Sequence, residues 1–389
     1  MKILLLIPTI AGFHAFLFGL ARKLLDQGYE VHVATSGWTQ SQDDDRFHHD
    51  QLTIHFLSMP RGSNVVGHIT TAKVLNQLVD QIGPDIIQAH FTAATLTAAL
   101  ARRRDWPPTI AMIQGMVFAI NKTGARRFWL RCIETFAYRR MDAVWVLTDD
   151  DYEELIKICG PEKSQLLNES MGFGCDLERF TSPTGSLKTE LRSCRGLAEA
   201  TFVFCYVGRQ VAFKGYGITV RAFLDLYERY PNLRLLVVGG RDSNHPTGLT
   251  KDEQRRAAMC PGIVDVGWSD NVEQLLAIAD SIVYPSEREG MPVSLMEALA
   301  MGVPAITCDT RGCRDIVRDG IDGIILKQRD VQHLASAMLE MVNKPDRKVQ
   351  FSKRAIADRD RFDRKHFITA NLNILRQWSW SSKSRCDLK

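Results

Sequence analysis

Two acidic residues flank a Gly-x-Pro turn in the stretch SEREGMPVSLMEALAMGVPAI. Glu289 directly precedes Gly290, and Glu297 lies eight positions further on. We expect a helix to begin at Pro292, because a proline at the first helical position loses no hydrogen bond, and to end at Gly302. The amides and the dipole of such a helix start attract anions, while Gly290 would let the backbone approach a ligand closely. The pattern therefore predicts an anion site between two carboxylates.

Carboxylates are also good acceptors for sugar hydroxyls. Acids on both sides of an anion site indicate a nucleotide sugar, whose diphosphate would lie at the helix start. For Glu297 alone the alternative remains open that it merely stabilises the start of the helix.

Two cations in YVGRQVAFKGYG suit the same ligand. Arg209 follows an apolar strand candidate, and Lys214 comes after a short loop. A guanidinium can hold a diphosphate in a bidentate way and an ammonium as a point charge. The alternative is that both side chains simply face solvent.

Short apolar segments alternate with helical patterns along both halves of the chain. The expected strands are 3–7, 30–35, 85–90, 108–115 and 143–148, then 202–208, 233–240, 262–268, 281–286 and 304–309. Alternation of this kind predicts parallel sheets with right-handed crossovers, and a break at 181–188 (TSPTGSLK) predicts two of them. The expected fold is α/β, with two Rossmann-like, doubly wound parallel-sheet domains facing across a cleft.

The expected domain boundaries follow from this break. Residues 1–180 would form an N-terminal acceptor-side domain and residues 187–360 a donor-binding domain. One helix at about 361–381 would pack back on the first domain.

The motifs together resemble the retaining glycosyltransferases of family 4, which have the GT-B fold. The resemblance rests on GR…KG, on the P-S-x-x-E-G-x-P-x-x-x-x-E-A-x-A-x-G-x-P pattern that begins at Pro285, and on GCRDIVRDGIDGIIL at 312–326. The N-terminal half matches more loosely, at PDIIQAH (84–90) and GFGCDLERF (172–180).

The resemblance implies a role for each matching residue. Arg209 and Lys214 would neutralise the donor diphosphate, Glu289 would hold hydroxyls of the transferred sugar at the reacting carbon, and Glu297 would bind the ribose. The other implied donor-site residues are Gly12, Gly290, Met291, Pro292 and Val293. His90 would lie near the reacting centre on the acceptor side; its alternative is a hydrogen-bonded structural histidine.

Two positions depart from the family pattern. The first loop, TIAGF, has one glycine where the family usually has two adjacent ones, and MIQGMVF has Gln114 where many members have histidine.

The resemblance also implies a mechanism and a substrate class. The family's retaining route proceeds on one face of the sugar, and the departing diphosphate can deprotonate the incoming hydroxyl. Similarity to the capsule and lipid-linked oligosaccharide branch of the family, carried by REGMP and GCRDIV, implies a UDP-N-acetylhexosamine donor. The acceptor that the resemblance implies is a glycan or a polyprenyl-diphosphate-linked oligosaccharide in capsule or lipopolysaccharide biosynthesis. A GDP-mannose or other hexose donor remains an alternative.

Neither Asp triplet, at 43–45 or 149–151, predicts a metal site. Thr148 followed by three acids is ordinary helix-start chemistry, and the first triplet follows no strand. We expect a metal-independent enzyme without a cofactor.

Three other functions remain open. A sugar-nucleotide epimerase would share the architecture and leaving-group site but need no acceptor surface. A nucleotide-sugar-binding pseudoenzyme is a second possibility. A dinucleotide dehydrogenase would require G-x-G-x-x-G after the first strand, which PTIAGFHAF does not provide.

Charge and hydropathy bear on location. The segment 101–140 carries nine basic residues and two acidic ones, a net charge of +7 that leaves −3 for the rest of the chain. It predicts either a solvated basic face or contact with an anionic membrane, and no nucleic-acid partner.

Residues 3–21 are apolar enough for a membrane segment, but Pro8, Thr9, Gly12 and His14 interrupt them and favour one βαβ unit. Nine dispersed cysteines favour a cytoplasmic protein. If the basic segment binds the membrane, the protein would lie on the inner face of the plasma membrane.

Overall fold

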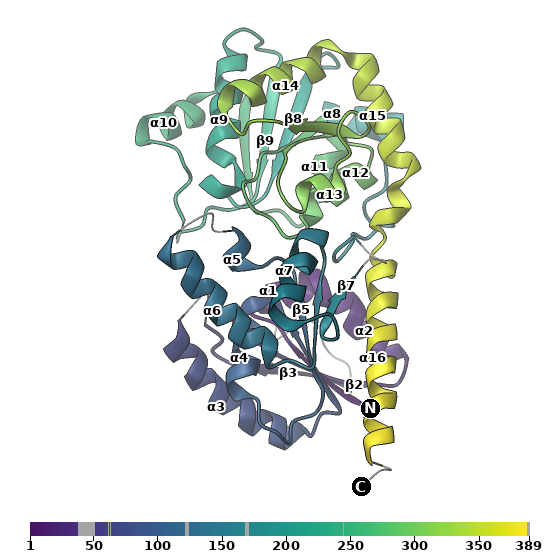
Figure 1. Cartoon of the computed structure of the whole chain (residues 1–389). Coiled ribbons are helices and arrows are strands. Elements are labelled where there is room, and N and C mark those ends of the chain that lie inside the picture. Colours follow the sequence, from purple (N-terminus) through teal and green to yellow (C-terminus); the bar gives the residue numbers. More distant parts are fainter. Residues whose placement is uncertain are drawn as a thin grey trace. The chain divides into compact units, whose positions relative to one another are not determined.

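The computed structural model describes residues 1–37, 51–60, 62, 64–120, 124–167, 171–243 and 245–386. The chain divides into two compact units. Unit 1 contains Met1–Gly172 and Lys365–Lys389, and unit 2 contains Phe173–Arg364. The last segment of the chain therefore belongs to the first unit (Figure 1).

Unit 1 is built on a seven-stranded sheet in the order β3-β2-β1-β4-β5-β6-β7, in which all neighbours pair in parallel. Its strands are β1 (Lys2–Leu6), β2 (Glu30–Thr35), β3 (Leu52–Phe56), β4 (Ile86–His90), β5 (Thr109–Ile113), β6 (Ala143–Val146) and β7 (Ser164–Leu166). The central strands are buried along their whole length, as parallel strands covered on both faces must be.

The helices of unit 1 connect these strands and cover the sheet. They are α1 (Ile10–Gly12), α2 (Phe18–Asp26), α3 (Val65–Ile82), α4 (Phe91–Ala101), α5 (Val117–Ile120), α6 (Ala125–Arg139), α7 (Asp149–Cys159) and α16 (Arg364–Cys386). A π-helical stretch, Phe13–Leu17, joins α1 to α2. Residues 3–21 thus form a strand and the start of a helix, as the sequence predicted.

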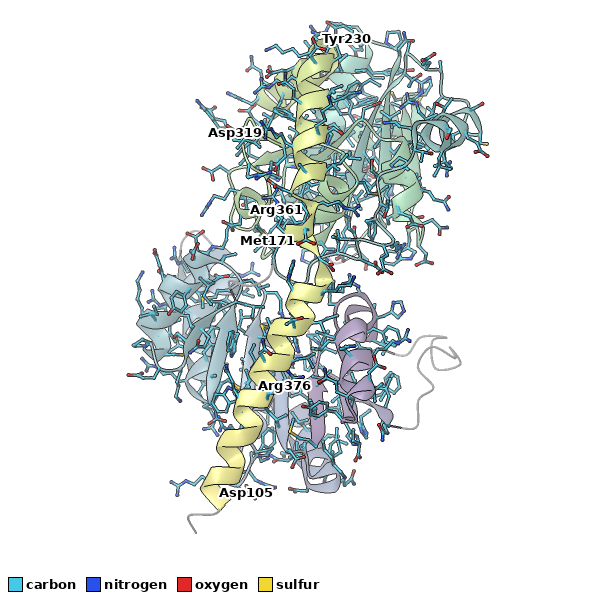
Figure 2. The ribbon with its side chains drawn as sticks, turned by 90° about the vertical axis from the view of Figure 1, so that its right-hand side faces the viewer. Asp105, Met171, Tyr230, Asp319, Arg361 and Arg376 are labelled. Carbon is cyan, nitrogen blue, oxygen red and sulfur yellow. The ribbon has the colours of Figure 1, made fainter. Side chains whose placement is uncertain are left out.

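The long helix α16 returns to unit 1 and packs beside its sheet. Its Asn371 side chain is buried, and its amide oxygen accepts a 2.8 Å hydrogen bond from Gln88 of β4. Further along the helix, Arg376 (labelled in Figure 2) donates to Gln27 just after α2. These contacts explain why the C-terminal segment groups with the first half of the chain.

Unit 2 has a six-stranded parallel sheet in the order β10-β9-β8-β11-β12-β13. Its strands are β8 (Phe202–Val207), β9 (Leu233–Val238), β10 (Ile263–Gly267), β11 (Ser281–Tyr284), β12 (Ala305–Cys308) and β13 (Gly323–Leu326). Its helices are α8 (Gly185–Ser193), α9 (Tyr216–Tyr227), α10 (Lys251–Met259), α11 (Val272–Ile278), α12 (Val293–Ala300), α13 (Cys313–Ile316), α14 (Val331–Asn343) and α15 (Pro345–Ala357), with 3-10 turns at Ala212–Lys214 and Arg359–Phe362.

Strand order reverses once in each sheet. In unit 1 the chain leaves β1 toward β2 and later returns to place β4 on the other side of β1; in unit 2 the corresponding pair is β8 and β11. Loops that leave two such strands diverge and open a crevice at their carboxyl ends, where ligands of open α/β sheets bind. Each unit therefore has one defined place for a site.

Candidate active site

Glu289 lies in the loop that leaves β11 at the strand reversal of unit 2. Its side chain is only 8% exposed and is held by three side chains. Lys214 approaches its two carboxylate oxygens at 2.6 and 2.7 Å, and the hydroxyls of Tyr284 and Ser286 donate to Oε1 at 2.9 and 2.6 Å. A charge-assisted cluster of this kind fixes both the acid and the cation before any ligand arrives.

Lys214 comes from the loop that leaves β8, the other strand of the reversal. The next residue, Gly215, has φ +83°, and a Cβ there would lie 2.4 Å from the carbonyl oxygen of Pro285. Arg329 ties the same two loops together by donating to the carbonyls of Pro285 and Ala212 at 2.8 and 2.9 Å. The sequence thus predicted both residues, and the fold brings them into direct contact.

Arg209 lies at the same sheet edge but contacts a different acid. Its guanidinium forms an ion pair with Asp242, which follows β9, and lies over the ring of Phe213. Arg288 lies over the same ring at 4.3 Å, so that two cations contact one aromatic ring. The Arg209 side chain is 52% exposed, which leaves it accessible to a ligand.

The helix expected after this loop is α12. It begins at Val293, and Pro292 is its N-cap with extended backbone. The expectation of Pro292 at the first helical position is therefore one residue off: ψ of 112° keeps this proline outside the helix. The first amides of α12 still lack intrahelical partners, as at every helix start, and Gly290, Met291 and Val293 are partly exposed beside them.

Glu297 lies on α12, apart from the Lys214–Glu289 cluster. Burial raises the pKa of its carboxyl to about 7, although Arg364 and Arg179 oppose this rise. Arg179 itself pairs with Glu273 at 2.7 Å. Glu297 is consequently an acid that changes charge near neutral pH.

Gly12 and His90 belong to unit 1: Gly12 lies in α1, after β1, and His90 is the last residue of β4, the other strand of the reversal. The amide of Gly12 donates to the Thr9 hydroxyl, which caps α1, and a Cβ on Gly12 would lie 3.1 Å from that oxygen. A larger residue would crowd this turn.

His90 is completely buried, and burial lowers the pKa of its imidazole to about 3. Its Nε2 lies 3.1 Å from the amide oxygen of Gln88, and its Nδ1 lies 3.4 Å from the amide nitrogen of Gln114. Gln114 in turn accepts from the backbone N–H of Phe91, whose φ of +68° is rare for a residue with a side chain. A neutral imidazole with both nitrogens engaged suits a positioning role better than proton transfer.

Sequence reasoning overlooked several partners. Tyr284 and Ser286 contact Glu289, and Asp242 contacts Arg209. Tyr284 and Ser286 are two positions apart at the end of a strand, which is a usable signal because such residues share one face. Asp242 could not be found in this way, because only the β8–β9 pairing brings it to Arg209.

Of the two Asp triplets, 149–151 lies at the start of a helix. Thr148 is the N-cap of α7 and its hydroxyl accepts from the amide of Asp151, as predicted for 149–151. The triplet 43–45 lies outside the described residues. Within the described part of the chain, no three His, Cys, Asp or Glu side chains form a group that could hold a metal ion.

Two family models match the chain. Residues 11–166 match the glycosyl transferase 4-like domain, and residues 188–358 match glycosyl transferases group 1. The putative glycosyltransferase EpsD of Bacillus subtilis is 26% identical over 89% of this chain and 88% of its own length. The UDP-Gal:alpha-D-GlcNAc-diphosphoundecaprenol alpha-1,3-galactosyltransferase of Escherichia coli is 24% identical over 76% of each chain.

Solved structures show the same fold. Anabaena Alr3699/HepE in complex with UDP and glucose has a TM-score of 0.77 at 20% identity and covers 97% of this chain and 99% of its own. Sucrose-phosphate synthase of Thermosynechococcus elongatus has a TM-score of 0.79 at 17% identity, with coverage of 97% and 98%. No helix in the described residues is both long and apolar enough to cross a bilayer. The chain is a glycosyltransferase of the hexosyltransferase type with a GT-B fold.

Proposed function

We propose that this enzyme is a retaining glycosyltransferase that moves an N-acetylhexosamine from a UDP-sugar to a polyprenyl-diphosphate-linked glycan in cell-surface polysaccharide biosynthesis. The observation that carries the donor site is the Lys214–Glu289 pair at the strand reversal of unit 2, next to the start of α12. The acceptor class is supported by the name of the Escherichia coli relative, which includes a diphosphoundecaprenol-linked sugar.

In this proposal the cations of unit 2 stabilise the leaving group. Lys214 and Arg209, with the first amides of α12, hold the diphosphate and the charge that develops as its bond to the sugar breaks. The acceptor oxygen forms the new bond on the same face of the sugar, and its proton passes to an oxygen of the departing diphosphate. The backbone that lines the donor site is that of Gly290, Met291, Pro292 and Val293.

The carboxylates have separate tasks. Glu289 orients the sugar hydroxyls and stabilises positive charge at the reacting carbon, while Glu297 binds the ribose hydroxyls. On the side of unit 1, Gly12 leaves room for the donor, and His90 fixes Gln114 and the Phe91 backbone as a neutral group.

A hexose donor is the second candidate. The Escherichia coli relative names UDP-galactose, and one HepE structure contains UDP-glucose. A thermal-shift panel of UDP-N-acetylhexosamines, UDP-hexoses and GDP-mannose decides between them, because a ligand that binds only the folded protein raises its melting temperature. Donor consumption with and without a GlcNAc-diphospholipid acceptor then separates a transferase, which needs both substrates, from an epimerase or a binding protein.

Transfer is expected to need no metal ion, because Lys214 and Arg209 supply the positive charge at the diphosphate. Activity in excess EDTA should equal activity without it. Loss of turnover in EDTA that manganese or magnesium restores would contradict this part of the proposal.

The enzyme is proposed to act on the cytoplasmic face of the membrane, with α6 as its contact. The basic segment 101–140 is not one surface, because Arg102 pairs with Asp142 and Arg103 with Asp80. On α6, by contrast, Phe128 and Trp129 are each 65% exposed among arginines. Such a helix can insert aromatic rings into the interface while each basic residue adds on the order of 1 kcal/mol.

Vesicle co-sedimentation at low and high salt tests this contact. The wild type should bind anionic vesicles, and a variant with Arg126, Arg127 and Arg131 changed to Ser should not. Equal binding by both proteins, or by neither, would rule out a membrane role for α6.

A further inference from the structure

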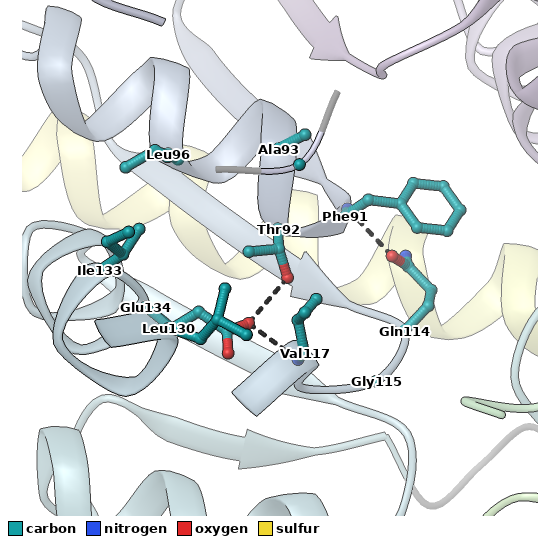
Figure 3. Close-up of a pocket in the computed structure, with 11 residues that line it drawn as sticks. Phe91, Thr92, Ala93, Leu96, Gln114, Gly115, Val117, Leu130, Ile133 and Glu134 are labelled. Carbon is teal, nitrogen blue, oxygen red and sulfur yellow. Dashed lines mark hydrogen bonds between the residues drawn. The ribbon is translucent and has the colours of Figure 1, made fainter. Parts of the chain in front are cut away.

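A cavity of about 210 Å³ lies within unit 1, and none of the residues assigned to the donor lines it. Its lining residues come from α4, α5 and α6, from Gln114 and Gly115 between β5 and α5, and from Gly62, just before α3. Most of the side chains that face it are apolar, among them Ala93, Leu96, Val117, Leu130 and Ile133 (Figure 3). The cavity thus favours a hydrocarbon ligand over a sugar.

The acid that lines this cavity, Glu134, is fully engaged by the protein. Its Oε1 accepts from the hydroxyls of Thr92 and Tyr138 and from the amide of Val117, at 2.9, 2.6 and 3.1 Å. Its Oε2 accepts from the amide of Phe118 at 2.7 Å. Three of these donors converge on Oε1 and one on Oε2, so the protein itself holds Glu134 in place. Through these hydrogen bonds Glu134 links α4, α5 and α6 and so shapes the cavity.

The surroundings of the cavity combine exposed apolar and basic side chains. Trp129, next to the lining residue Leu130, is 65% exposed, and Val66, four residues after Gly62, is 75% exposed. The guanidinium of Arg131 lies over the ring of Phe118 at 5.6 Å, beside the lining residue Val117. An apolar cavity near exposed apolar side chains and a cation matches a hydrocarbon chain that carries a phosphate.

We propose that this cavity takes the isoprenoid units nearest the diphosphate of the lipid-linked acceptor. This assignment rests on the acceptor class of the proposed function. It identifies the part of unit 1 that binds the lipid chain of that acceptor. An engineered dry cavity of about 150 Å³ accepts benzene, so about 210 Å³ has room for roughly one or two five-carbon units. The branched chain, rather than a straight acyl chain, is the occupant because the acceptor proposed above carries its diphosphate on a polyprenyl chain.

Binding of farnesyl diphosphate to the full-length protein tests this directly, without any sugar transfer. Two variants fill the cavity from opposite walls: Ala93→Leu on α4 and Leu130→Trp on α6. Cys132→Trp, at an exposed position of α6, adds bulk outside the cavity and serves as the matched control. Inorganic diphosphate reports on the head group alone and dodecyl phosphate on a straight chain, and melting temperatures verify that every variant is folded.

The wild type and Cys132→Trp should bind farnesyl diphosphate, and both cavity variants should bind it at least about tenfold more weakly, with inorganic diphosphate unaffected. Equal binding of farnesyl diphosphate by all four proteins, or none by the wild type, would overturn the assignment. Dodecyl phosphate could instead bind as tightly as farnesyl diphosphate and lose the same affinity in the cavity variants. That result would overturn the isoprenoid occupant in favour of a membrane acyl chain. Absence of transfer to any polyprenyl-linked acceptor would instead overturn the proposed function and leave the binding result standing.

Discussion

Glu289 and Glu297 are eight residues apart, yet their surroundings give them different properties. Glu289 has a lysine and two hydroxyls in direct contact, which hold its carboxylate in one orientation. For Glu297, by contrast, burial raises the pKa of the carboxyl to about 7. Sequence spacing identified both acids, but only packing separates a fixed acid from a titrating one.

Glu297→Gln should stabilise the free enzyme at pH 8 and have little effect at pH 5. Folding raises the pKa of Glu297 from its ordinary 4.5 to about 7, so the folded state binds the proton more tightly. Stability therefore falls as pH rises from about 4.5 through 7, and a residue that cannot ionise avoids this loss. The melting temperature should increase by a few degrees at pH 8, about what 1 kcal/mol gives in a domain of this size.

Melting curves of the wild type, Glu297→Gln and Glu190→Gln, an exposed control, at both pH values check this. The same difference between wild type and Glu297→Gln at pH 5 and pH 8 would show that Glu297 does not titrate as described. Binding of UDP should also weaken in Glu297→Gln, since the amide accepts ribose hydroxyls less strongly than a carboxylate.

At the scale of elements, the loop before α12 is held in place by backbone packing. Gly312, at the start of α13, has φ +77°, and a Cβ there would lie 1.9 Å from the carbonyl oxygen of Gly290. The glycine therefore permits close contact between two loops at the end of the sheet. The same motif, GCRDIV, contributed to the family resemblance in the sequence, where its physical role was not visible.

Gly312→Ala should weaken donor binding by roughly tenfold or more, because the new methyl group displaces Gly290 and with it Glu289. Gly320→Ala is the matched control: its φ of +71° imposes similar backbone strain, of about 1–2 kcal/mol, but no atom lies within 4 Å of the new Cβ. Titration of UDP against both folded variants measures the difference. Equal affinities in the two variants would show that Gly312 does not support the donor loop.

The sequence predicted most strands to within two residues, including β2 (Glu30–Thr35) without any difference. It missed β3, β7 and β13. β7 has only three residues, too few for a period-two pattern, and β13 lies in a glycine-rich stretch. The π-helical stretch at Phe13–Leu17 also escaped, because its apolar pattern is the same as that of an α-helix. Contacts between distant strands, such as Arg209 with Asp242, depend on strand order and could not be read from local patterns.

At the scale of the whole molecule, each unit has its own hydrophobic core and its own strand reversal. The proposed donor residues of unit 2 come from two loops and from α12. UDP should therefore slow hydrogen exchange chiefly at 209–215, 286–293 and the first turns of α12, where binding suppresses local opening.

Hydrogen exchange with and without UDP across the full chain measures this pattern. The start of α10, in the same unit but away from the strand reversal, is an internal control that should not change. Protection concentrated at α10 or β13 would place the nucleotide elsewhere in unit 2.

The most direct test of the account is sugar transfer by Glu289→Ala and Glu289→Gln, with the donor that the thermal-shift panel selects. Both variants should remain folded, with melting temperatures within a few degrees of the wild type, and should lose at least about 10²-fold in kcat, the loss expected when a group that stabilises transition-state charge is removed. Near-normal turnover by either folded variant would contradict the assignment of Glu289 to the reacting carbon and, with it, the proposed active site.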